Sequence, residues 1–97
     1  MAIRVVIERK VKEGKQSDMM NVLRELRTSA LQRTGYISGE TLRSKDDPLT
    51  YVVLSNWQTV EDWEAWRKHP ERRKIGERLE PLLASPEKCS VFLHVYP

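Results

Sequence analysis

The chain has 97 residues, which is the size of a single domain, so we expect one domain over residues 1–97. Its 17 Lys and Arg residues and 14 Asp and Glu residues give a net charge of +3. A charge this small does not by itself indicate a nucleic-acid or membrane-surface partner. A single Cys excludes an intramolecular disulfide, and because a domain of this size hides only about 60% of its unfolded surface, we expect self-association to supplement the core.

The N-terminus has no secretory signal pattern, and no apolar run approaches the roughly 18 residues of a membrane span. We therefore expect a cytoplasmic protein without a membrane partner. The chain also lacks a glycine-rich phosphate loop, a Gly-x-Ser-x-Gly nucleophile turn and a close cluster of metal ligands. These absences disfavour dinucleotide chemistry, serine hydrolysis and zinc chemistry, and we expect no metal.

The first part of the chain predicts a strand followed by a helix. Apolar residues recur at even spacing from Ile3 to Val11, with charged residues between them, as in a strand with one apolar face. Gly14 ends this strand, and Ser17 is suited to cap a helix whose apolar residues recur at three- and four-residue steps. Gly35 can adopt the left-handed conformation common after helices, so we expect this helix to end there.

A hairpin and a second helix follow. Residues 36–43 and 50–57 are strand-like runs, joined by a polar connection containing the Asp and Pro residues that turns favour. The Thr59 hydroxyl can then cap a helix, and Asp62 can reach back to the Thr59 N–H, the capping-box arrangement. We therefore predict an antiparallel hairpin leading directly into a capped helix.

The remaining chain predicts a broken helix and a last strand. Pro70 disfavours helical geometry at His69 and suits the first position of a new helix, so we expect a break between these two residues. Pro81 should kink or loosen the end of that new helix. From Cys89 to Tyr96 apolar and other residues alternate, which predicts a strand, with Cys89 as a small buried residue.

The predicted order is strand, helix, strand, strand, broken helix, strand. This order is typical of an α+β protein of the ferredoxin-like kind, with a four-stranded antiparallel sheet and the helices on one face. Because the helices cover only that face, we expect the apolar and aromatic side chains of the other face to meet a second sheet.

Four segments together resemble the antibiotic biosynthesis monooxygenase-like family: Val-Lys-Glu-Gly-Lys (11–15), Arg-Thr-Gly-Tyr-Ile-Ser-Gly (33–39), Ser-Lys-Asp-Asp-Pro (44–48) and Asn-Trp-Gln-Thr-Val-Glu-Asp (56–62). The resemblance implies a homodimeric α+β barrel in which two sheets face each other and each subunit keeps a pocket between sheet and helices. It also implies a range of activities: oxidation of polycyclic phenols or anthrones without a cofactor, heme degradation, and action on quinones or signalling molecules.

The chain departs from the family pattern in two places. Ser55 stands where members often carry a Glu, two residues before the Trp that ends the strand. Members that degrade heme pair a first-strand Asn with a Trp and a later His; Trp66 matches the Trp, but Ile7 and Gly76 stand at the other two positions. The resemblance therefore disfavours heme and leaves His69 as a shifted replacement ligand. We expect no cofactor.

Trp66 and His69 are the candidate catalytic residues. The Trp66 indole can provide a flat apolar wall and an N–H donor for an oxyanion, and His69 is suited to proton abstraction near neutral pH. The candidate substrate-binding residues are Ile7, Asn56 and Trp63. Each also has a structural interpretation: core packing for the two Trp residues, a helix cap for His69 and a turn contact for Asn56.

The sequence thus favours a cofactor-independent monooxygenase acting on a small aromatic molecule, a polycyclic phenol or quinol. The alternative is a non-catalytic protein of the same fold that binds a hydrophobic ligand such as heme or a quinone. We expect no nucleic-acid partner, because the third strand (50–57) lacks the basic and aromatic signature of RNA-binding sheets.

Overall fold

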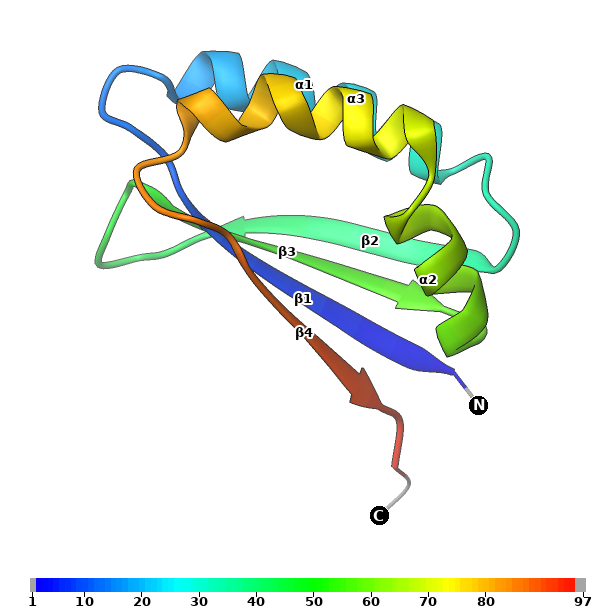
Figure 1. Ribbon diagram of the computed structural model, residues 1–97. Coiled ribbons are helices and arrows are strands. Elements are labelled where there is room, and N and C mark those ends of the chain that lie inside the picture. The colour runs from blue at the N-terminus through cyan, green and yellow to red at the C-terminus, as the bar shows by residue number, and fades with distance from the viewer. Residues whose placement is uncertain (1, 96–97) are drawn as a thin grey trace.

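The computed structural model describes residues 2–95, and its order of elements confirms the predicted one (Figure 1). The four strands form one antiparallel sheet in the order β2-β3-β1-β4. The helices lie together on one face of this sheet, the ferredoxin-like arrangement (Figure 1). The elements are β1 (Ile3–Lys10), α1 (Gln16–Ala30), β2 (Tyr36–Arg43), β3 (Thr50–Trp57), α2 (Val60–Arg67), α3 (Pro70–Leu79), the short 3-10 helix η1 (Glu80–Leu82) and β4 (Lys88–Leu93).

Helix α1 differs from its prediction at both ends. It begins at Gln16, and the preceding Lys15 makes no side-chain cap, so the prediction that Ser17 caps the helix is wrong. Gly14 has a φ of +83°, and this turn starts the helix before Ser17 is reached. At the other end α1 stops at Ala30, whereas Gly35, also at φ +83°, lies in the connection to β2.

The start of α2 and the helix break agree with the sequence pattern, with one exception. Thr59 Oγ1 accepts a hydrogen bond from the Asp62 N–H at 3.1 Å, as a capping residue should. The Asp62 carboxylate instead lies beside Gly35, where an added Cβ would collide with it. His69 precedes α3 and Pro70 is its first residue, which confirms the break. Pro81 lies in η1, after α3 has ended.

The core between sheet and helices is divided into two clusters. The first contains Ile3, Val5, Ile7 and Ala30 together with all three Trp residues. The second contains Val11 and residues of α1, β3 and α3. Between Ile7 and Val11, the same face of β1 carries Arg9, whose side chain is 2% exposed. A buried guanidinium therefore separates the two halves of the core.

Strand β4 is exposed along its whole length. The predicted strand is confirmed as far as Leu93, while Tyr96 lies outside the described residues. The prediction that Cys89 is buried is wrong, because its side chain is exposed. Strand β4 is an edge strand of the sheet (Figure 1), so Cys89 has a neighbouring strand on one side only, where it pairs with Ile7.

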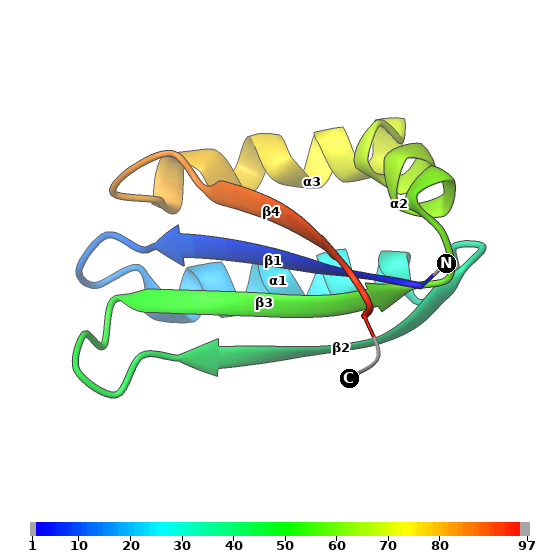
Figure 2. The same cartoon turned by 90° about the horizontal axis from the view of Figure 1, so that it is seen from below.

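The face of the sheet opposite the helices has no covering element within residues 2–95, as Figure 2 shows from below. Strand register places on it an apolar group made of Val6, Leu42, Val52, Leu54 and Phe92. Leu42 and Phe92 are 48% and 54% exposed. Across residues 2–95, no helix combines the length and apolar composition that crossing a membrane would require.

Candidate functional site

A cavity opens between the sheet and the helices, close to the point where Arg9 divides the core. Its volume is about 70 Å³, and it is open to solvent on one side. Four aromatic rings line it, from Tyr36, Trp57, Trp63 and Trp66, with aliphatic side chains from α1, β1 and β3 between them. The cavity is therefore suited to a small, flat and mainly apolar ligand.

The aromatic walls are held in place by contacts with one another. Tyr36 and Trp57 meet edge to face with their ring centres 5.2 Å apart, and Trp57 and Trp63 are tilted at 5.8 Å. The Trp57 indole N–H donates to Ser55 Oγ at 3.1 Å. Ser55, which departs from the family pattern, thus serves as a buried hydrogen-bond acceptor that orients Trp57.

Tyr36 brings a hydroxyl group to this cavity, and Gly39 leaves the space for it. A Cβ at Gly39 would collide with the Tyr36 hydroxyl, so only glycine permits this position of the ring. Burial raises the pKa of the Tyr36 phenol. The phenol therefore remains protonated around neutral pH and can donate a hydrogen bond to a ligand oxygen.

Arg33 lies against Trp66 at the junction of the helices. Its guanidinium carbon lies 5.2 Å from the centre of the Trp66 ring. Nη2 donates to Glu71 Oε2 at 2.7 Å, Nε donates to the Ser29 carbonyl at 3.3 Å, and Nη1 lies 3.0 Å from His69 Nε2. These hydrogen bonds connect the end of α1 to the break between α2 and α3, and so hold Trp66 in position.

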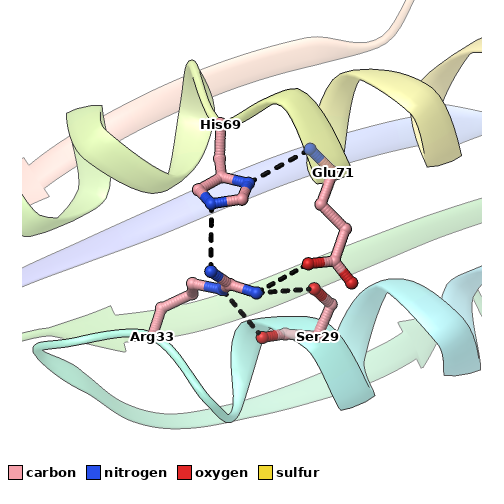
Figure 3. Close-up of polar contacts among 4 residues, drawn as sticks. All are labelled: Ser29, Arg33, His69 and Glu71. Atoms are coloured by element: carbon pink, nitrogen blue, oxygen red, sulfur yellow. Dashed lines mark hydrogen bonds and ion pairs between the residues drawn. The ribbon is translucent and has the colours of Figure 1, made fainter.

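His69 uses its side chain as the cap of α3. Its Nδ1 accepts from the Glu71 N–H at 3.1 Å, while its Nε2 faces a nitrogen of Arg33 (Figure 3). Arg is a donor only, and a neutral imidazole has one acceptor nitrogen, so His69 can accept one of these two bonds at a time. His69 is not among the cavity-lining residues.

The predicted site residues fall into two groups in the structure. Trp66, Trp63 and Ile7 line the same cavity, where α2 and β1 bring them together. Asn56 and His69 do not line it. Asn56 points to the opposite face of the sheet, where Arg4 Nε donates to its Oδ1 at 3.2 Å and its Nδ2 donates to Ser38 Oγ at 3.0 Å. It therefore contacts neither the cavity nor the turn toward α2.

The sequence interpretation missed three Arg residues that line the cavity, namely Arg9, Arg27 and Arg72. Arg9 lies on the buried face of β1, where Glu87 Oε2 accepts from its Nη2 at 2.9 Å. Arg72 of α3 lies with its guanidinium carbon 5.3 Å from the centre of the Trp63 ring. Burial lowers the pKa of the Arg9 and Arg72 guanidinium groups. The signal for Arg9 was present, since it stands two residues after Ile7 and so on the same face.

Comparison with known proteins identifies the family. The model of the antibiotic biosynthesis monooxygenase family matches residues 2–78, which is more than half of the chain. The protein therefore belongs to this family, which supports a monooxygenase-like function. The curated protein SchA from Streptomyces halstedii is 23% identical over 79 residues, which cover 81% of this chain and 21% of SchA. The chain thus spans about a fifth of the length of that relative.

Solved structures support the same fold. A candidate antibiotic biosynthesis monooxygenase of Nitrosomonas europaea superimposes with a TM-score of 0.90 at 20% identity, covering 99% of this chain and 92% of that one. SnoaB from Streptomyces nogalater, a cofactor-independent oxygenase, has a TM-score of 0.89 at 16% identity, covering 99% of this chain and 95% of its own. At these identities the similarity demonstrates the fold alone.

Proposed function

We propose that this protein is a cofactor-independent monooxygenase whose substrate is a small aromatic phenol or quinol. The observation that carries the proposal is the cavity walled by Trp57, Trp63, Trp66 and Tyr36, in a chain that belongs to the antibiotic biosynthesis monooxygenase family. The cavity of about 70 Å³ is smaller than the roughly 150 Å³ that admits benzene. Part of a ligand's ring system must therefore lie in the mouth.

Such a reaction needs little from the protein. Deprotonation of an electron-rich substrate gives an anion that transfers an electron to O₂, and the two radicals then combine; loss of water converts the oxidised carbon to a carbonyl. Trp66 provides a wall and an N–H donor for the oxyanion, and the protonated Tyr36 provides a second donor. Because His69 is committed to the α3 cap, bound water takes the base role in this scheme.

An oxygen-uptake assay with a panel of anthrones and quinols tests this function. We expect Trp66→Phe, which keeps an aromatic ring but removes the N–H donor, to lower kcat/KM about 10- to 100-fold on the substrate found. Tyr51→Phe is the control, since Tyr51 belongs to the second core cluster and does not line the cavity.

Two results would count against the enzyme. Binding of panel compounds without oxygen uptake would favour the alternative, a non-catalytic ligand-binding protein. Unchanged turnover by Trp66→Phe would remove the assigned role of its indole N–H. Heme is not favoured as the ligand, because His69, the His considered as its axial ligand, lies outside the cavity lining.

We also propose that the active form is a homodimer, in which the uncovered sheet faces of two copies pack together. The apolar group on that face is bordered by both positive and negative side chains, Arg4 and Lys88 against Glu8 and Glu40. Mixed charges around an apolar centre suit a two-fold interface, where each patch meets its own copy. The exposed edge strand β4 adjoins the same face.

Phe92→Glu is expected to shift the protein from dimer to monomer in size-exclusion chromatography with light scattering. The substitution places a charge within the apolar group of the proposed interface, where Phe92 is 54% exposed in one subunit. Leu31→Glu is the matched control, because Leu31 is 57% exposed but follows α1 in the helix layer. A wild-type protein that is monomeric at micromolar concentration would refute the proposed dimer.

A further inference from the structure

We infer that the ligand of the cavity is an aromatic acid, and that Arg9 binds its carboxylate from the sheet side of the cavity. This inference rests on the proposed function only in assuming that the same cavity takes an aromatic ligand. It adds the charge of the ligand and the residue that recognises it.

Arg9 has hydrogen-bond donors that the protein leaves unused. Its side chain is 2% exposed and lines the cavity. Glu87 accepts from Nη2 alone, at 2.9 Å. The Nε and Nη1 atoms of Arg9 are buried and have no hydrogen-bond partner among the atoms of residues 2–95. Buried donors are nearly always paired, so these two are suited to a ligand acceptor.

The charges around the cavity favour an anion. Three Arg residues line it, the buried Arg9, the half-buried Arg72 and the exposed Arg27, whereas Glu40, the one acidic residue at its border, is on the opposite face of the sheet by strand register. Glu87 neutralises only part of the charge of Arg9 and Arg72. Burial lowers the pKa of both groups, yet an Arg remains protonated in proteins. A buried cation without a full partner is costly, and a ligand carboxylate would reduce that cost.

The unpaired donors of Arg9 indicate which acceptor group the ligand carries. A carboxylate has two oxygens that only accept, and its hydrogen bonds to a guanidinium are charge-assisted and short. The apolar body of the ligand would meet the rings of Trp63 and Trp66, which line the same cavity. An aromatic ring carrying one carboxylate satisfies both requirements, whereas a neutral analogue satisfies only the second.

Two nearly isosteric probes, 2-naphthoate and 2-naphthamide, separate these requirements. The chain has three Trp residues, and all three line the cavity, so their indole N–H signals in an NMR titration report binding at this place. We expect the wild type to bind 2-naphthoate at least about tenfold more tightly than 2-naphthamide. Arg9→Met should abolish this preference while leaving the affinity for 2-naphthamide unchanged.

Two further variants make the test specific and keep it decisive if Arg9→Met does not fold. Arg24→Met removes an exposed Arg of α1 that contacts Asn21, and it should keep the preference. Glu87→Gln removes the carboxylate that competes for Arg9, and it should tighten the binding of 2-naphthoate several-fold without affecting 2-naphthamide.

The outcomes that overturn the inference are distinct from those that overturn the proposed function. Equal affinity of the wild type for the two probes, or a preference that survives in Arg9→Met or fails to rise in Glu87→Gln, contradicts the assignment of Arg9 and leaves an aromatic-binding cavity in place. Absence of any shift of the indole signals with either probe contradicts both the inference and the proposed function.

Discussion

Replacing Trp57 with alanine is expected to lower the free energy of unfolding by about 3–5 kcal/mol. Trp57 is 1% exposed, ends β3 and pairs with Ile3 of β1. Its ring contacts Tyr36 and Trp63, so it joins the sheet to α2 through the first core cluster. The space left by the ring adjoins the existing cavity, and neighbours fixed in two elements cannot close it.

Urea unfolding followed by circular dichroism measures this loss. Ser55→Ala is the control, because it removes the hydrogen bond to the Trp57 indole but keeps the ring, and it should cost only about 1 kcal/mol. Against a typical total stability of about 5–15 kcal/mol, the Trp57→Ala loss is large. A loss no greater than that of Ser55→Ala would show that the Trp57 ring is not a principal anchor of the core.

Gly35→Ala is the second substitution with a large expected effect. The left-handed backbone at φ +83° costs a non-glycine residue about 1–2 kcal/mol. The added Cβ would also collide with the Asp62 carboxylate and Cβ, and such overpacking typically costs about 1–3 kcal/mol more. The free energy of unfolding should therefore fall by roughly the sum of the two.

Gly14 provides a matched control for the backbone contribution. It has the same φ of +83°, but nothing lies within 4 Å of the position of its Cβ. Gly14→Ala should therefore show the backbone cost alone. In an Asp62→Gly background the effect of Gly35→Ala should fall to that of Gly14→Ala. If the two glycine substitutions cost the same in the wild type, the collision with Asp62 has no energetic consequence.

Most of the fold could be predicted because its signals are local. Alternation in β1 and β3, the Thr59 cap and the break before Pro70 each depend on a few neighbouring residues. The errors arise where contacts between segments distant in the sequence determine the structure. Cys89 is exposed because β4 is an edge strand of the sheet, and no periodicity within β4 reports its place in the sheet.

The candidate site was only partly predictable, for a related reason. Alternation along β3 could have excluded Asn56 from the cavity, since its neighbours Ser55 and Trp57 face the helices. The alternation along β1 also places Arg9 on the buried face, although a charged residue at that position interrupts the apolar pattern. Arg72 could not have been found in this way, because its contact with Trp63 depends on how α3 folds back beside α2.

The buried Arg9 also bears on how stable this domain can be. An apolar side chain at that position would let the two core clusters merge into one, and replacing buried ionic groups with well-packed apolar ones is often stabilising. The chain instead keeps a charged side chain at a position where the fold would accommodate an apolar one. On the proposal that Arg9 binds a ligand carboxylate, this position exchanges part of the packing stability of the domain for ligand binding.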